Sequence, residues 1–276
     1  MKTPILTIIL LAAGLPGIQT TQKLPDAPTK QPTAPQNHAA SPQSFTREQA
    51  LNYFAQATIG WEKATTPGMH AEMVLLNKGV KDGKPVEIYK IKVTGAPPLK
   101  KYSLDIWPIT YANPGTVMEG LMIDAQGRVG CPAHSADSCS KNFDGSEISL
   151  SYSPTKGEIY RNALISTDKK SRVFFSVVPD PILGREGACS LEVLQIQPNF
   201  ELALIRGRGF KPGESVAFHS QSFQEVHDVE AKADQQGQFW VPFTPYVEGK
   251  TSGTTSVTGK SAACAPTVSF NWGTAK

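Results

Sequence analysis

Histidine and acidic side chains are the first candidates for chemistry in this chain. His219 and His227 fall in one predicted hairpin, with Glu225 and Asp228 close by in sequence. Their matching parity predicts that a bent hairpin brings the two imidazoles together, an arrangement that suits a transition metal. His134 is a further candidate, in a short segment between two cysteines. None of these groups has an evident third ligand, so we expect no metal and no cofactor and keep a His-centred metal protein or hydrolase as an alternative.

The sequence lacks the common catalytic motifs. It contains no G-x-S-x-G, no H-E-x-x-H and no G-x-x-x-x-G-K-[ST] phosphate loop. The pair Gly207 and Gly209 is followed by Phe-Lys-Pro, which predicts a turn and not the helix that a dinucleotide-binding motif requires. We therefore expect a protein that is not an enzyme.

Two tryptophans are candidates for ligand binding. In the segment 238–243, alternation places Phe239 and Phe243 on one face of a strand and Trp240 on the other. In the segment 102–107, Trp107 likewise opposes the apolar set, whereas Trp272 shares the parity of its apolar neighbours and is expected in a core. An outward Trp240 or Trp107 either stacks on a sugar or is covered by the helix, the neighbouring domain or a partner chain.

The four cysteines predict disulfide bonds. They are Cys131, Cys139, Cys189 and Cys264, and an even number in an exported chain is typical of disulfides. Proximity favours Cys131–Cys139, which leaves Cys189–Cys264 to join the beginning of the last domain to its end. A zinc site is the weaker interpretation because no C-x-x-C pair is present.

The N-terminal composition predicts export. Lys2, the apolar run from Ile5 to Ala13 and then Gly14 and Pro16 match a secretory signal peptide over residues 1–20. This run is shorter than the about 20 residues that span a membrane as a helix. Residues 21–43 are Pro-rich and are expected to form a disordered tether. We expect a secreted, periplasmic or cell-surface bacterial protein with no transmembrane segment after signal removal.

The net charge argues against nucleic acid as a partner. It is only +3, and the longest basic runs are pairs of lysines. The chain has 23 glycines and 22 prolines, which makes long helices improbable. The partners left open are an envelope or extracellular protein, or a glycan.

The periodicity predicts one short helix followed by many strands. Residues 44–57 carry a capping box at Thr46 and Gln49 and an apolar stripe at helical spacing. From Met69 onward the period is two, and Asp82-Gly83 between two alternating runs predicts a hairpin. The further expected strands are 102–106, 117–123, 147–152, 158–166, 172–178, 191–196, 203–206, 215–219, 226–233, 238–243, 253–258 and 267–272.

The strands form two similar sets. The segment around Gly127 parallels that around Gly237, and Gly95 is matched with Gly207. A unit of about 110 residues that occurs twice has the size of an immunoglobulin-like sandwich. We place the first unit, with its helix, at residues 44–180 and the second at 181–276.

The second unit carries a family resemblance. The stretch 207–216, the turn 233–239 and the closing Val-Ser-Phe-Asn-Trp resemble immunoglobulin-like modules of uncharacterised bacterial exported proteins, over residues 190–273. The resemblance implies a β-sandwich at the cell surface and carries no functional residue. The sequence thus predicts a mainly β protein of two tandem immunoglobulin-like β-sandwiches with one short N-terminal helix. The expected function is a non-catalytic structural or protein-binding module of the envelope, with a carbohydrate-binding module as the alternative.

Overall fold

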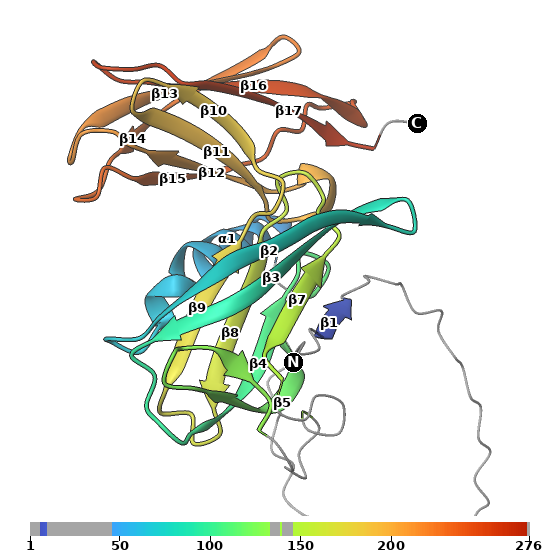
Figure 1. The fold of residues 1–276 in the computed structure, drawn as a ribbon. Coiled ribbons are helices and arrows are strands. Elements are labelled where there is room, and N and C mark those ends of the chain that lie inside the picture. Colours follow the sequence, from blue (N-terminus) through green and yellow to red (C-terminus); the bar gives the residue numbers. More distant parts are fainter. Residues whose placement is uncertain (1–5, 10–45, 133–138, 140–145, 275–276) are drawn as a thin grey trace, which may run out of the picture.

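The structure is a computed structural model that describes residues 6–9, 46–132, 139 and 146–274. The prediction of a mainly β protein is confirmed, with several antiparallel sheets and the single α-helix α1 (Arg47–Gly60) over these residues (Figure 1). The predicted tether lies outside the described residues. So does the predicted signal peptide, except for β1 (Leu6–Ile9). No helix in the described part is long and apolar enough to cross a membrane.

The first unit consists of two sheets that pack on a shared core. The first sheet has the order β1-β7-β3-β2, and the second has the order β6-β5-β4-β8-β9. Residues from both sheets, such as Ile91, Leu104, Leu150 and Leu164, are at most 1% exposed and belong to one apolar cluster. The bounds are β2 (His70–Lys81), β3 (Lys84–Thr94), β4 (Lys101–Trp107), β5 (Gly115–Ile123), β6 (Val129–Gly130), β7 (Ile148–Tyr152), β8 (Tyr160–Ser166) and β9 (Arg172–Val177).

The second unit also has two sheets around one core. Their orders are β10-β11-β12-β15 and β14-β13-β16-β17. Leu191, Ile205, Val216, Val257 and Trp272 lie in its apolar cluster, as expected for Trp272. The bounds are β10 (Ile182–Glu186), β11 (Cys189–Gln195), β12 (Ala203–Arg208), β13 (Ser215–Ser222), β14 (Glu225–Lys232), β15 (Phe239–Phe243), β16 (Ser252–Lys260) and β17 (Thr267–Gly273), with short 3-10 turns at Glu62–Ala64 and Pro198–Phe200.

The two units share one strand order. Strands β2, β3 and β7 pair in the same sequence as β11, β12 and β15, and β5, β4, β8 and β9 pair in the same sequence as β14, β13, β16 and β17. A turn confirms the match: Asp124 and Asp234 each accept two backbone N–H groups through Oδ1 at 2.9 Å. Gly127 and Gly237, which close these turns, both have a positive φ.

One detail of the predicted repeat is wrong. Gly95 corresponds by its contacts to Gly209 and not to Gly207. Gly95 and Gly209 both have a positive φ, and they lie against the backbone carbonyls of Gly68 and Ala188, which precede the matched strands β2 and β11. Gly207 has no positive φ, and its missing side chain instead leaves room for the ring of Phe239. The predicted boundary between residues 180 and 181 falls in the link between β9 and β10.

The helix α1 packs against both units. Its predicted capping box is present, since Gln49 N–H donates to Thr46 Oγ1 at 3.2 Å and Thr46 N–H donates to the Gln49 side chain at 2.8 Å. Ala55 lies in an apolar cluster with Leu194 and Leu204 of the second unit, while Trp61 at the end of the helix packs on the first unit. In Figure 1, α1 lies beside the two units where they meet.

A loop of the first unit also binds the second unit through its backbone. Gly157, between β7 and β8, donates to Asp180 O and accepts from Gln195 N–H, both at 2.7 Å. A side chain at Gly157 would lie 3.0 Å from Ile182 Cδ1 and 3.1 Å from Val193 O. The helix and this loop therefore join the units through two independent contacts.

Candidate functional site

A cavity of about 390 Å³ opens at one end of the first unit and is a candidate site. We call it the end cavity. It is lined by the first residues of β3 and β8 and the last residues of β4 and β7, together with the loop 108–111. Sequence reasoning missed it because four strand ends that are distant in the chain form it. The alternation of apolar and polar residues along each strand predicts which side chains point inward. It does not predict where the packed core ends and a cavity begins.

Buried polar side chains form the inner wall of the end cavity. Asn162 is fully buried, and its Oδ1 accepts from the Tyr152 hydroxyl at 2.9 Å. Tyr160 Oη lies 2.9 Å from Glu158 Oε2 and 3.1 Å from Ser153 O. The rings of Tyr152 and Tyr160 are in contact, with centroids 4.3 Å apart. Hydrogen-bonding groups and aromatic rings therefore alternate along this wall.

Burial sets the protonation of these groups. It raises the pKa of Glu158, although hydrogen bonds from Tyr160 and Thr155 act in the opposite direction. Burial likewise raises the pKa of Tyr160, and the neighbouring Glu158 adds to the effect. Both phenols stay protonated at neutral pH, because burial also raises the pKa of Tyr152. The inner wall thus contains hydroxyl and amide groups and the carboxyl group of Glu158, whose burial is only partly offset by its hydrogen bonds.

Arg161 is held beside the end cavity by contacts that leave it little freedom. Its guanidinium lies 3.8 Å from the ring centroid of Trp107, donates to Trp107 O at 3.2 Å and donates to Thr58 Oγ1 at 2.9 Å. Burial lowers the pKa of Arg161 to about 10, so it is charged at neutral pH. No carboxylate of the described chain forms an ion pair with it. The ring of Trp107 provides its charge compensation through a cation–π contact.

The two candidate tryptophans point away from the cores of their units, as predicted. Both instead pack in apolar clusters that include residues of α1. Trp107 is 2% exposed and contacts Phe54 and Trp61. Trp240 is partly buried in the cluster that α1 forms with the second unit, with Arg206 5.1 Å from its ring. The burial of Trp107 leaves no ring face for a sugar. The alternative of cover by the helix therefore describes Trp107.

The candidate histidines do not meet. In the β13–β14 register His219 is opposite Asp228, and Ser220 is opposite His227. The two histidines therefore point to opposite faces of the sheet, and the prediction that they approach each other is wrong. His219 Nδ1 contacts Asp228 Oδ1 at 2.7 Å, and His227 Nε2 lies 3.7 Å from Glu225 Oε2. His134 lies outside the described residues.

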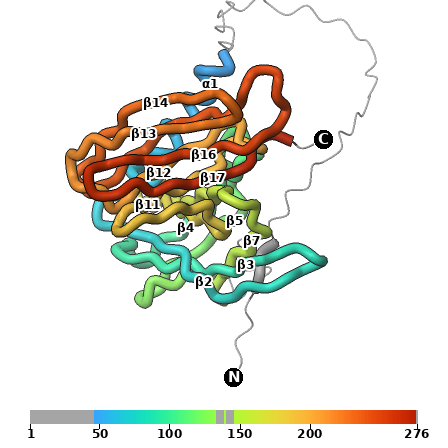
Figure 2. Tube along the Cα trace, turned by 90° about the horizontal axis from the view of Figure 1, so that it is seen from above, coloured from blue at the N-terminus to red at the C-terminus, as the bar shows by residue number. Residues whose placement is uncertain are grey.

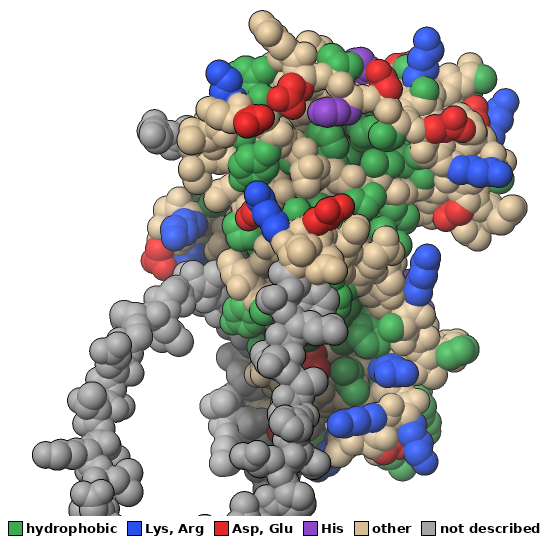
Figure 3. Space-filling model, turned by 180° about the vertical axis from the view of Figure 1, so that it is seen from behind, with side chains coloured by type: hydrophobic (Ala, Val, Ile, Leu, Met, Phe, Trp, Pro, Cys, Tyr) green, Lys and Arg blue, Asp and Glu red, His purple; other side chains and the backbone are tan. Residues whose placement is uncertain are grey.

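No metal-binding group was found where the structure describes the chain, in the sense of three or more His, Cys, Asp or Glu side chains gathered together. The cysteines are instead paired as predicted, Cys131 with Cys139 and Cys189 with Cys264. Charged groups of both signs are interspersed over the second unit, seen at the top of Figure 3.

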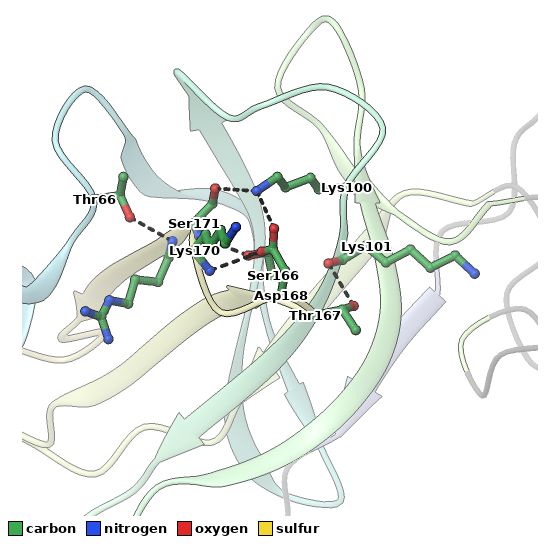
Figure 4. Close-up of polar contacts among 9 residues, drawn as sticks. Thr66, Lys100, Lys101, Ser166, Thr167, Asp168, Lys170 and Ser171 are labelled. Atoms are coloured by element: carbon green, nitrogen blue, oxygen red, sulfur yellow. Dashed lines mark hydrogen bonds and ion pairs between the residues drawn. The ribbon is translucent and has the colours of Figure 1, made fainter.

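A polar network at the β8–β9 turn has a structural role (Figure 4). Asp168 accepts from Ser166 Oγ at 2.6 Å, from Lys100 Nζ at 2.9 Å and from Lys170 N–H at 3.1 Å. The hydrogen bonds from Ser166 and Lys100 hold the pKa of Asp168 well below its usual range. Both carboxylate oxygens of Asp168 thus take part in holding the turn, so we assign it no binding role.

Comparisons with known proteins identify no family. No family model matches the chain, and no curated protein matches it. Among solved structures it is similar to a tetra-tandem repeat in the extending region of a large adhesion protein, with 10% identity over 75% of this chain and 49% of that chain and a TM-score of 0.25. It is also similar to a DUF3823 family protein from Bacteroides ovatus ATCC 8483, with 13% identity, coverage of 75% and 98%, and a TM-score of 0.22. The chain spans about half the length of the first, and at these TM-scores neither likeness bears on the argument.

Proposed function

We propose that this chain is an exported, non-catalytic module of the bacterial envelope, built from two immunoglobulin-like β-sandwiches, that presents a projecting hairpin to a protein partner. The strand order supports the immunoglobulin-like assignment. In each unit the first, second and fifth of seven matched strands share one sheet, and the other four share the second sheet. This is the distribution of strands in immunoglobulin-like folds that carry a C′ strand.

The hairpin of β2 and β3 carries the proposal. It extends beyond the rest of the first unit in both Figure 1 and Figure 2. Leu75, Leu76 and Val80 are 42%, 44% and 74% exposed on it. The register shifts between Leu75 and Asn77, so that Leu76 has no partner on β3. Apolar side chains exposed together on a projecting element are typical of a protein-binding surface.

The contacts between the units support a structural role for the rest of the molecule. The α1 cluster and the Gly157 loop restrict rotation of one unit against the other. A partner bound to the hairpin would therefore be held at a fixed position relative to the second unit. The two disulfides are what an oxidising compartment allows, and they support export together with the signal-like N-terminus.

Site-specific photo-crosslinking in the native host tests the proposal. A photoreactive residue at Val80 should give one discrete crosslinked protein in the envelope fraction. The same residue at Phe223, an exposed apolar position on the β13–β14 hairpin of the second unit, is the control. Leu76→Glu should abolish the Val80 crosslink without changing the amount of exported protein. The proposal fails if the crosslink at Val80 survives Leu76→Glu, or if Val80 and Phe223 give the same products.

A further inference from the structure

The end cavity has the size and the surroundings of a small-ligand site. Its volume of about 390 Å³ lies within the 300–1,000 Å³ that is usual for ligand pockets. It lies between strand ends of a rigid unit, and its inner wall is made of side chains that are buried and hydrogen-bonded. Because packing and hydrogen bonds already hold the side chains of this wall, little side-chain entropy is lost when a ligand binds.

The hydroxyl of Tyr160 leaves a hydrogen bond to be completed. It has one proton but lies within hydrogen-bond distance of two acceptors, Glu158 Oε2 and Ser153 O. When the carboxyl group is ionised, one of these acceptors lacks a donor from Tyr160. Glu158 is 8% exposed, so water reaches it poorly. A ligand hydroxyl group could donate to the acceptor that Tyr160 leaves, or to the Tyr160 oxygen itself.

Asn162 fixes the position of this wall. One of its two amide N–H groups donates to Tyr160 O at 3.1 Å, and its Oδ1 accepts from Tyr152. Because Asn162 is fully buried, it does not contact a ligand itself, and its hydrogen bonds hold Tyr152 and the backbone of Tyr160 in place.

The charge and the aromatic wall restrict the ligand further. Lys84, Arg161 and Glu158 are the charged side chains that line the cavity. Arg161 is 1% exposed and its guanidinium is engaged by Trp107 and Thr58, so it is not available to bind a phosphate or carboxylate directly. Tyr111 lines the cavity and is 48% exposed, so it offers a ring to an apolar ligand face.

We propose that the end cavity binds a neutral saccharide, with one sugar ring against Tyr111 and its hydroxyl groups bonded to Tyr160 and Glu158. A sugar ring combines weakly polar faces with hydroxyl groups that both donate and accept, which are the properties that this wall requires. This inference goes beyond the proposed function. It does not depend on the hairpin having a protein partner, and it moves saccharide binding from Trp107 and Trp240 to a different place.

Titration calorimetry of the purified protein with neutral monosaccharides and disaccharides of glucose, galactose, mannose and N-acetylglucosamine tests it. At least one should bind saturably at one site. Tyr111→Ala and Tyr160→Phe should each weaken that saccharide by about tenfold, which corresponds to about 1.4 kcal/mol for a lost ring contact or hydrogen bond. The uronic acid of the same sugar should bind more weakly than the neutral sugar, because its carboxylate approaches Glu158.

Tyr246→Ala is the matched control, because Tyr246 is a partly exposed tyrosine that packs on Trp272 in the second unit. It should leave saccharide affinity unchanged. Thermal unfolding would show that Tyr111→Ala folds normally. The proposal is overturned if no saccharide of the panel binds saturably, or if affinity is unaffected by both cavity variants. It is equally overturned if binding depends on Trp240 and not on Tyr111. None of these outcomes bears on the crosslink at Val80.

Discussion

The turn between the last two strands is held by different chemistry in the two units. In the first unit Asp168 in the β8–β9 turn binds Lys100, and Thr66, before the first strand, accepts from Arg172 N–H at 3.0 Å. In the second unit the β16–β17 turn contains Cys264, which is bonded to Cys189 at the start of β11. The start of the first matched strand, β2 or β11, is thus connected to the end of its unit through hydrogen bonds in one copy and through a covalent bond in the other.

The fold requires the position of this last turn but not the interaction that holds it. In both units the turn lies against the beginning of the opposite sheet, although hydrogen bonds hold it in one and a disulfide in the other. The turns at Asp124 and Asp234 show the contrary case, because both keep Asp, Gln and Gly at matching positions and the same hydrogen bonds from backbone N–H groups to the aspartate. A side-chain substitution should therefore have unit-specific effects at the last turn and matching effects at the aspartate turns.

The largest effect is expected from removing the covalent connection of the second unit. Cys189 and Cys264 are separated by 75 positions, against 8 for Cys131 and Cys139. On loop-closure entropy, these disulfides contribute about 4.5 and about 2.5 kcal/mol respectively to the free energy of unfolding. Denaturant unfolding of the double variant Cys189→Ser/Cys264→Ser should show the larger loss.

Cys131→Ser/Cys139→Ser is the matched control for that experiment. Its loss of stability should be smaller by about 2 kcal/mol, because its loop is shorter. Equal losses in the two double variants would contradict the account. They would mean that the long disulfide adds little to the hydrogen bonds and packing that already hold the last turn of the second unit.

Local rules in the sequence were sufficient for the features that depend on neighbouring residues. The capping box at Thr46, the hairpin at Asp82-Gly83 and the correspondence of Gly127 with Gly237 were predicted because they depend on a few adjacent positions. The strand β10 was missed because its second half, Gly-Arg-Glu, is polar and follows two prolines. Its position is determined by pairing with β11, which no local pattern encodes.

The candidate site was beyond sequence reasoning for a different physical reason. The outward direction of Trp107 and Trp240 was predicted from alternation, and cover by the helix was one of the alternatives. No local pattern could decide between exposure and cover, since α1 is distant in the chain from both. The predicted approach of the two histidines was wrong because of the strand register. Ser222 is opposite Glu225, so an odd-numbered residue of β13 shares its face with an even-numbered residue of β14. If the same sequence used one more residue in the loop, the register would shift by one and His219 and His227 would lie on the same face.

Two glycine substitutions test whether the aspartate turns are equivalent. A side chain at Gly127 would lie 2.1 Å from Val93 O, and one at Gly237 would lie 2.1 Å from Phe210 O. Since both also have a positive φ, Gly127→Ala and Gly237→Ala should each cost about 3 kcal/mol in thermal or denaturant unfolding. Gly213→Ala is the control, because its φ is +74° but nothing lies within 4 Å, and it should cost only about 1 kcal/mol. Unequal costs at Gly127 and Gly237 would argue against the duplication.

The edge strands offer a smaller, local test of the comparison. β7 pairs in parallel with β1, whereas its counterpart β15 is the last strand of its sheet. If residues 1–20 are removed on export, β7 becomes an edge strand as well. Hydrogen exchange in a peptide covering 148–152 should then be about tenfold faster in the chain that lacks residues 1–20 than in the full chain, corresponding to about 1.4 kcal/mol of local opening. Exchange in β4 is the internal control. Unchanged exchange in β7 would show that the N-terminal strand does not protect this edge.

The smallest effect is expected at Asp168, and its sign depends on pH. Hydrogen bonds from Ser166 and Lys100 lower the pKa of Asp168 in the folded state. Its contribution to stability is therefore present above the unfolded-state pKa of about 3.9 and is lost as the pH falls through the lower folded-state pKa. Asp168→Asn should lower the melting temperature slightly at pH 7, less so in high salt because the carboxylate is exposed, and still less at about pH 2. A loss at Asp168 that is independent of both pH and salt would mean that turn geometry, and not charge, holds this turn. The two units would then differ only in the covalent bond of the second.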